Sequence, residues 1–430
     1  MKAQRKMAGN LASLGFALAL VAGLFTLPGC SRGLGSSSST GGGGGTGGGT
    51  GNSLAIAVNA GPANNDVNTP LASVTICIPG TSNCQTITDV LVDTGSNGLR
   101  VLETQVTIPL TNATDTNGNP LGECAMFADG SFLWGSVSTV DITLAGEKAS
   151  AVPIQIIRTT GSVGFPLVPN TCSGNGTDDG NVSALGANGI LGVGLFKQDC
   201  GVNCVSTPPA NMYYDAGAAC TQASCALIAV PLVNQVQNPV SLFAKDNNGV
   251  LVSLPSVGAT GAVSVSGSLI FGIGTQSNNA LGTAKVYTTD GLGHFTATFT
   301  PPGGVATGYP QSFIDSGSNT FAFLDAATSG LTDCSTLVPP GPAGFYCPAS
   351  STNFTVTNTG NNGVNAPVMF SIFSAQSLFT ANPTFTAFSN LGSPFAGAFD
   401  YGLPFFYGRS VFVGIEGQTT PGGTGPFFAY

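Results

Sequence analysis

The chain has 430 residues, of which 62 are Gly and only 7% are charged, with a formal net charge of −9 at pH 7. Globular proteins usually carry about a quarter charged residues, so this balance excludes a nucleic-acid binder built on basic patches. The single His, His294, excludes multi-His metal sites and must serve any Ser/His/Asp triad. The hydrophobic share of 42% argues against disorder, and the length allows two lobes with cores of their own.

The N-terminus has the pattern of an export signal. Lys2, Arg5 and Lys6 precede an apolar run at residues 11–27, and Cys30 follows shortly after it. We predict that residues 1–30 are a lipoprotein-type signal peptide and that Cys30 is lipidated. An ordinary secretory signal and a short membrane anchor are the alternatives. The predicted location is the bacterial cell envelope, lipid-anchored on the periplasmic or outer-membrane side, or outside the cell if Cys30 is not lipidated.

Residues 31–52 consist almost entirely of Gly, Ser and Thr. Such a segment cannot bury a core and behaves as a coil, which predicts a tether between the anchor and a folded body. The alternative is a low-complexity sequence that arose by drift, and such a sequence could still serve as a tether.

The chain has eleven Cys, so ten remain for disulfides if Cys30 carries a lipid. Sequence does not determine connectivity, but local spacing favours four short pairs and leaves one long pair. The predicted pairs are Cys77 with Cys84, Cys200 with Cys204, Cys220 with Cys225, Cys334 with Cys347, and Cys124 with Cys172. Zinc is the competing use, and the missing His partners and the oxidising compartment argue against it.

From residue 53 onward, short runs of Val, Ile, Thr and Phe alternate with Gly, Asn, Pro and Ser clusters, which predicts an all-β body. The clearest strands are predicted at residues 73–78, 137–144, 262–272 and 410–415. Residues 246–249 predict a hairpin turn between strands 241–244 and 250–254. Short helices are predicted at residues 231–237 and 375–381.

An Asp-hydroxyl-Gly-Ser motif occurs twice in the same apolar context. Leu91-Val92-Asp93-Thr94-Gly95-Ser96 is echoed in the second half by Phe313-Ile314-Asp315-Ser316-Gly317-Ser318. A single copy in so Gly-rich a chain would indicate a turn. Two neighbouring carboxylates cannot both ionise easily, so the ionised one can take a proton from water while the other donates to a carbonyl oxygen. The repeat therefore predicts that Asp93 and Asp315 form a catalytic pair.

The segment from Asp93 to Val101, with the sequence DTGSNGLRV, resembles the first active-site loop of the pepsin-like aspartic peptidases, and the second motif resembles their second loop. Further segments match in order. Residues 127–131 and 140–144 resemble the flap hairpin and its return strand, 188–194 the strand behind the first loop, 266–272 the opening strand of the C-terminal lobe, and 402–409 its threading strand. The resemblance covers about residues 55–430 and is nearest to an uncharacterised bacterial family of secreted or lipoprotein pepsin-like proteins.

The resemblance implies two β-barrel-like lobes, residues 53–258 and 259–430, related by a pseudo-two-fold axis with a cleft between them. It also implies a role for each residue of the loops around Asp93 and Asp315. The hydroxyls of Thr94 and Ser316 would lock the two loops together. Gly95 and Gly317 would let substrate and water approach closely. Ser96 and Ser318 would each hydrogen-bond the neighbouring Asp. Residues at the flap tip would be Phe127, Asp129, Gly130 and Ser131.

Two positions depart from the pattern of the pepsins. Phe127 stands where most have Tyr, and Arg100 stands where the first loop commonly has Trp. The hydrogen bond between those two side chains cannot form here, and its loss could slow or abolish turnover. We expect Arg100 near the cleft, where it binds an anionic peptide group or stabilises the ionised pair; a solvated charge at a strand end is the alternative.

These observations predict an aspartic endopeptidase in which water, activated by Asp93 and Asp315, attacks a peptide bond without a covalent intermediate. One alternative is a catalytically weak or inactive module that binds peptide or another macromolecule at the cell envelope. Another is a structural or adhesive surface protein. The predicted partners are peptide or unfolded protein in the cleft and a membrane through Cys30. We expect a monomer with no nucleic-acid partner, metal or cofactor.

Overall fold

The computed structural model describes residues 51–158, 162, 164–206, 210–301 and 303–430. The predicted signal peptide, with Cys30, and all but the last two residues of the predicted tether lie outside the described residues. Short strands are the main regular secondary structure of the described chain.

The strands are β1 (Ser53–Asn59), β2 (Thr69–Cys77), β3 (Cys84–Asp93), β4 (Asn97–Leu102), β5 (Leu121–Met126), β6 (Phe132–Leu144), β7 (Glu147–Ile157), β8 (Gly189–Val193), β9 (Tyr213–Asp215), β10 (Gly249–Ser253), β11 (Val265–Phe271), β12 (Val286–Thr288), β13 (Phe295–Phe299), β14 (Thr307–Ile314), β15 (Phe321–Leu324), β16 (Thr352–Thr359), β17 (Asn365–Ile372), β18 (Gly392–Ser393), β19 (Phe395–Tyr401), β20 (Ser410–Gly414), β21 (Thr419–Thr420), β22 (Gly423–Thr424) and β23 (Phe427–Ala429). The α-helices are α1 (Asn170–Ser173), α2 (Val182–Leu185), α3 (Ala326–Ser329) and α4 (Ala375–Ala381). Short 3₁₀ turns are η1 (Glu103–Gln105), η2 (Gly201–Cys204), η3 (Leu232–Asn234), η4 (Pro239–Leu242), η5 (Cys334–Thr336) and η6 (Leu403–Phe405).

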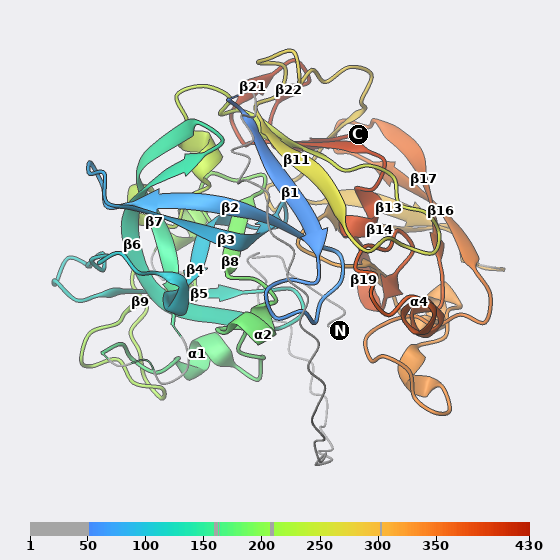
Figure 1. Cartoon of the computed structure of the whole chain (residues 1–430), viewed down its shortest axis with the longest axis horizontal. Coiled ribbons are helices and arrows are strands. Elements are labelled where there is room, and N and C mark those ends of the chain that lie inside the picture. The colour runs from blue at the N-terminus through green and yellow to red at the C-terminus, as the bar shows by residue number, and fades with distance from the viewer. Residues whose placement is uncertain (1–50, 159–161, 163, 207–209, 302) are drawn as a thin grey trace, which may run out of the picture.

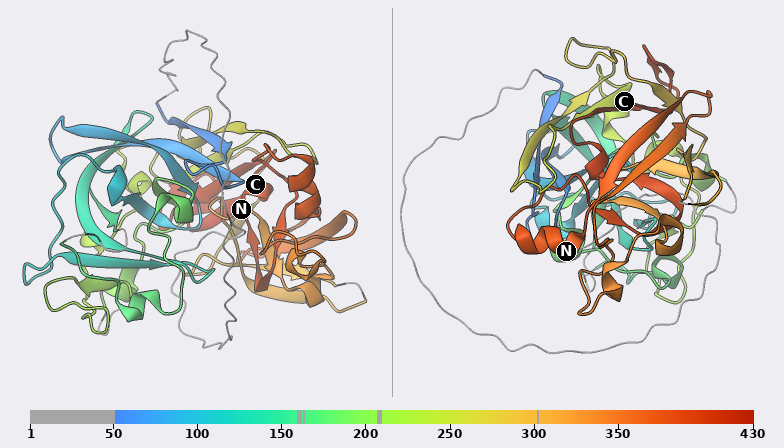
Figure 2. Two further views of the ribbon diagram at one scale, coloured as in Figure 1. Left: turned by 60° about the horizontal axis from the view of Figure 1, so that its bottom comes forward. Right: turned by 90° about the vertical axis from the view of Figure 1, so that its right-hand side faces the viewer.

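Two large sheets organise these strands. A 14-stranded sheet has the order β12-β23-β20-β10-β11-β1-β2-β3-β8-β4-β7-β6-β5-β9, and a 7-stranded sheet has the order β17-β16-β13-β14-β19-β15-β18. Figure 1 shows the blue-to-green strands on one side and the orange-to-red strands on the other, with β1 and β11 between them. The left view of Figure 2 keeps this separation. The predicted mainly β, two-lobed architecture is confirmed.

The larger sheet joins the two halves of the chain. Strand β1 pairs antiparallel with both β2 and β11, and β10 pairs antiparallel with β11 and β20. Strands distant in sequence are thereby hydrogen-bonded along their length at the junction. This continuity fixes how the two lobes lie relative to each other.

Aromatic packing fills the core of the second lobe. Along β16 and β17, inward-facing residues alternate with outward-facing ones, and Phe354 and Phe370 are among those buried. Phe323 lies edge-on to Phe354 at 5.0 Å between ring centroids and stacks on Phe399 at 5.4 Å. The high Phe content of the sequence therefore has a structural role in this core.

The five predicted disulfides are confirmed. Four close short loops, and the fifth, Cys124–Cys172, joins β5 to α1; the other pairs are Cys77–Cys84, Cys200–Cys204, Cys220–Cys225 and Cys334–Cys347. Disulfides persist in oxidising compartments, which agrees with an exported protein. Within the described residues, no helix combines the length and hydropathy needed to cross a membrane.

The local predictions of helices and turns were confirmed in part. Helix 375–381 is confirmed as α4, where Ser374 accepts a hydrogen bond from the N–H of Ser377. The helix predicted at 231–237 is reduced to η3. The predicted strand 241–244 and its hairpin are wrong: Pro239 and the side chain of Asn238 begin η4, and β10 pairs instead with β11 and β20.

Candidate active site

Asp93 and Asp315 each follow a buried strand. Asp93 is the last residue of β3, and Asp315 comes directly after β14. The residues before them, Val92 and Ile314, have no exposed surface. A parallel strand lies beside each one, β8 next to β3 and β19 next to β14. The repeated motif thus occupies equivalent places in two equivalent strand arrangements.

The two loops are joined by hydrogen bonds that run in both directions. The N–H of Thr94 donates to Oγ of Ser316 at 3.0 Å, and the N–H of Ser316 donates to Oγ1 of Thr94 at 2.9 Å. Each hydroxyl also donates to the opposite strand, Thr94 to the carbonyl of Ile314 at 3.4 Å and Ser316 to that of Val92 at 2.8 Å. This reciprocal set fixes the separation of the loops and matches the arrangement that the resemblance implies.

Gly95 and Gly317 make room for the carboxylate of the opposite loop. A Cβ on Gly95 would lie 2.5 Å from Cγ of Asp315, and a Cβ on Gly317 would lie 2.7 Å from Oδ1 of Asp93. Neither glycine has a positive φ, so the restriction is steric and does not come from the backbone conformation. Each glycine therefore allows the two carboxylates to come together.

Asp93 accepts two hydrogen bonds from its own loop. The N–H of Gly95 donates to Oδ1 at 2.8 Å, and Oγ of Ser96 donates to Oδ2 at 2.5 Å. The residue has no exposed surface. These donors orient the carboxylate and satisfy it in a buried site.

Asp315 has the matching environment in the second loop. The N–H of Gly317 donates to Oδ1 at 2.7 Å, and Oγ of Ser318 lies 2.8 Å from Oδ2. Burial raises the pKa of Asp315 well above its ordinary value, and the charge of Asp93 and a hydrogen bond with it raise the pKa further. The pair therefore has the environment in which one proton is shared between two acids.

Replacing Thr94 by Val should weaken the joint between the loops. Val keeps the shape of Thr but leaves the buried N–H of Ser316 without its acceptor, which costs about 1–3 kcal/mol. Urea unfolding measures the loss, and Thr94→Ser should recover most of it because the hydroxyl returns. An unchanged free energy of unfolding in Thr94→Val would show that other contacts hold the loops together.

The hairpin of β5 and β6 carries the residues predicted at a flap tip. At its turn the N–H of Gly130 donates to the carbonyl of Phe127 at 2.9 Å, and Ser131 donates through its N–H and hydroxyl to Asp129. Phe127 is 4% exposed and belongs to an apolar cluster that includes Leu91. The tip thus packs its aromatic ring near the strand that leads into the first Asp loop.

The same hairpin is tied to a neighbouring segment. The Cys124–Cys172 disulfide links β5 to α1, and the backbone of Phe132 bonds to both Thr177 and Asp179. A cavity of about 480 Å³ lies between the tip and this segment. Any opening of the hairpin must therefore bend its tip or carry the α1 segment with it.

Arg100 lies in a buried ion cluster and does not face a substrate. It has no exposed surface, and its Nη2 lies 2.8 Å from Oε1 of Glu123 and 3.0 Å from Oδ2 of Asp199. Nη1 donates to the carbonyl of Asn97, and the hydroxyl of Tyr213 donates to Asp199 at 2.8 Å. The predicted contact with substrate and the alternative of a solvated charge are both wrong, because two buried acids already pair with this guanidinium.

A third carboxylate near the pair was missed by the sequence analysis. Oδ2 of Asp400, on β19, lies 2.6 Å from Oγ of Ser318. We expected the threading strand at residues 402–409, but the strand beside β14 is β19, and η6 follows it. Matching Gly192 in β8 with Gly402, which follows β19, would have placed Asp400 at the position of Ile190.

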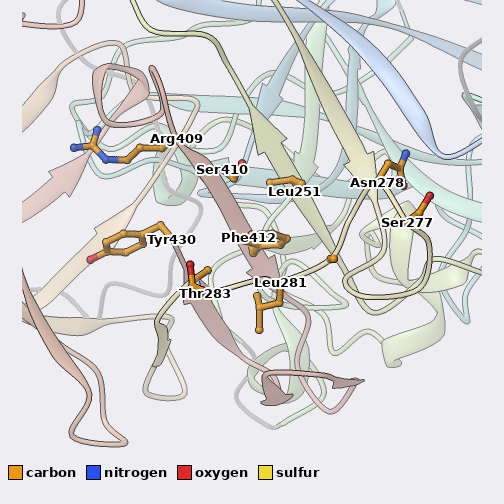
Figure 3. Close-up of a pocket in the computed structure, with 11 residues that line it drawn as sticks. Leu251, Ser277, Asn278, Leu281, Thr283, Arg409, Ser410, Phe412 and Tyr430 are labelled. Atoms are coloured by element: carbon orange, nitrogen blue, oxygen red, sulfur yellow. The ribbon is translucent and has the colours of Figure 1, made fainter.

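A separate cavity of about 520 Å³ lies on the sheet that joins the halves (Figure 3). Its walls come from β10, β20, residues 277–284 and Tyr430. Arg409 lines it, but its guanidinium donates to the carbonyl of Phe405 and packs over that ring. The lining residues all lie outside the two Asp loops. Among the described residues, no group of three or more His, Cys, Asp or Glu is arranged to hold a metal ion.

Comparisons with known proteins place the chain in a family. No curated protein matches it. Among solved structures, it is similar to an aspartic proteinase from Irpex lacteus, at 14% identity and a TM-score of 0.46, with 88% of this chain and 96% of that chain covered. A family model described as "Protein of unknown function (DUF3443)" matches residues 48–430. Since that match spans most of its length, the chain belongs to the DUF3443 family.

Proposed function

We propose that this protein is an aspartic endopeptidase that hydrolyses peptide bonds with Asp93 and Asp315. The observation that carries the proposal is the reciprocal hydrogen bonding of Thr94 and Ser316, which holds the two buried carboxylates together. A turn with only a structural role would need no second copy of the motif. It would also not need a glycine at the position where a Cβ would clash with the carboxylate of the opposite loop.

The chemistry follows from one proton shared between two carboxyl groups. The ionised member takes a proton from water, whose oxygen adds to the peptide carbonyl carbon, while the protonated member donates to the carbonyl oxygen. The proton taken from water then passes to the leaving nitrogen as the C–N bond breaks. The products are a carboxylic acid and an amine, and no covalent intermediate with the protein forms.

A second candidate is a module that binds peptide without turning it over. It is favoured by the absence of exposed surface on both Asp93 and Asp315 and by the disulfide that ties the β5–β6 hairpin to α1. Because neither acid has exposed surface, water and substrate reach the pair only if the residues that cover it move, and a site that never opens would leave the acids unused.

The proposal also covers the cellular location of the protein, its partner and its oligomeric state. The protein would act at the bacterial cell envelope, held by a lipid on Cys30, or be secreted if Cys30 is not lipidated. Its partner would be peptide or unfolded protein between the two lobes, which we assign as residues 53–258 and 259–430, and it would work as a monomer.

Cleavage of an unfolded protein by the purified chain from about pH 3 to 7 tests the proposal. We expect a bell-shaped profile that pepstatin abolishes, because the pair is active only while it holds one proton. Since the pKa of Asp315 is raised, that proton is kept above the usual Asp value of about 3.9, and the alkaline limb should lie above it. Absence of cleavage across the range would favour the binding module.

A further inference from the structure

Ser318 places its hydroxyl between two carboxylates. Its Oγ lies 2.8 Å from Oδ2 of Asp315 and 2.6 Å from Oδ2 of Asp400, and all three residues are buried. A hydroxyl carries a single proton, so Ser318 can donate to only one of the two acids. The other short contact therefore requires a proton that belongs to a carboxyl group.

The hydrogen-bond donors around each acid indicate where that proton resides. Asp315 also accepts the N–H of Gly317, which stabilises its charged form. Asp400 has no such support: its Oδ1 is buried and makes no hydrogen bond. An ionised carboxylate placed this way would be costly, and a buried acid without donors takes up a proton instead. Burial accordingly raises the pKa of Asp400 well above its ordinary value.

The surroundings of Asp400 contain few other charges. On the strands at either side, its paired residues are Phe313 on β14 and Ala322 on β15. The charge of Asp93 raises the pKa of Asp400, and the charge of Asp400 in turn raises the pKa of Asp315. An ionised Asp400 would therefore place a second negative charge beside a pair that already carries one.

The first lobe provides an internal comparison. Ile190 on β8 pairs with Leu91, two residues before Asp93, just as Asp400 pairs with Phe313, two residues before Asp315. An apolar side chain thus serves at this position in one lobe, where Ser96 contacts Asp93 without a third acid. The carboxyl group in the second lobe is not required by the strand arrangement itself.

We propose that Asp400 is a positioning residue that stays protonated at neutral pH, donates to Oγ of Ser318, and thereby keeps the Ser318 proton on Asp315. The inference rests on the proposed function only in that it treats Asp315 as part of the catalytic pair. The direction of the hydrogen-bond chain, from Asp400 through Ser318 to Asp315, does not depend on turnover.

Two variants of the full chain test this assignment. Asp400→Asn keeps a donor for Ser318 but cannot ionise, whereas Asp400→Ile copies the residue of the first lobe and removes the donor. Infrared difference spectra at about pH 7 report protonated carboxyl groups, and signals from other acids cancel between wild type and variant. We expect a carboxylic-acid band in the wild type that both variants lack. No such difference band would overturn the proposal.

The pH dependence of stability gives a second readout without any substrate. A group with a raised pKa in the folded state contributes stability below its unfolded pKa, and that contribution is lost as the pH rises. The unfolding midpoint of Asp400→Asn relative to wild type should therefore increase between about pH 3.5 and 7. A difference that is independent of pH would contradict a raised pKa at this position.

Peptide cleavage then separates positioning from simple packing. Asp400→Asn should retain wild-type cleavage with the same alkaline limb, and Asp400→Ile should lose kcat with little change in KM, because Ser318 is no longer held toward Asp315. Equal rates in all three proteins would refute the positioning role. If the wild type itself fails to cleave, the proposed function fails, while the infrared and stability results still decide the proton on Asp400.

Discussion

Replacing Arg100 by Ala is expected to lower the free energy of unfolding by about 3–5 kcal/mol, because it leaves Glu123 and Asp199 buried without their cation. Burial and the charge of Glu123 raise the pKa of Asp199 well above its ordinary value, while Arg100 opposes that shift. At low pH Asp199 is protonated and needs Arg100 least. The deficit of the variant should therefore widen as the pH rises from about 4 to 7. Urea unfolding at several pH values measures it.

Two further variants make this result specific. Arg100→Met fills most of the volume without the charge, so it should reproduce most of the loss if the ion cluster is responsible. Lys148→Ala removes a cation that is 57% exposed and lies 3.4 Å from Asp141, and it should change the free energy of unfolding by about 0–1 kcal/mol. A loss in Arg100→Ala no larger than that of Lys148→Ala would contradict the buried cluster.

Features encoded by nearby residues could be predicted from the sequence. The strands before Asp93 and Asp315 were visible as apolar pairs, and the four short disulfides followed from local spacing. The closeness of the two Asp loops depended on recognising the repeat, since Thr94 and Ser316 lie far apart in the chain. Their mutual hydrogen bonds then followed from the resemblance.

Contacts between residues that only the tertiary fold brings together, such as those of Arg100, could not be predicted from local sequence. Arg100 was expected near substrate because its position in the loop was known but its partners were not. Glu123 lies on β5, and Asp199 follows β8, so only the packed sheet brings them to Arg100. A charged residue in a strand carries no local signal of whether it is solvated or paired inside.

Asp400 was missed for a related reason. Its strand had been placed a few residues too late, at a Gly-Leu sequence that begins a 3₁₀ turn. The register of a parallel strand is fixed by its neighbours, and a shift of a few residues changes which side chain lies beside Ser318. Alignment of Gly402 with Gly192 would have corrected it.

Replacing Asp93 or Asp315 by Asn is expected to reduce peptide cleavage by about 10²- to 10⁴-fold, since Asn has the shape of Asp but can neither take nor release the proton that the reaction needs. Asn remains able to accept the N–H of Gly95 or Gly317 through its amide oxygen, so the loops should stay folded. Asp89→Asn is the matched control. That residue lies on β3, is partly exposed and has a φ of 55°, which Asn adopts readily.

The initial rate of cleavage of an unfolded protein, at the acid pH where the wild type is fastest, is the most direct measurement. Wild type and Asp89→Asn should cleave at the same rate, and both Asp93→Asn and Asp315→Asn should lose cleavage while unfolding at a similar urea concentration. Cleavage by either variant at the wild-type rate would contradict hydrolysis by the Asp93–Asp315 pair.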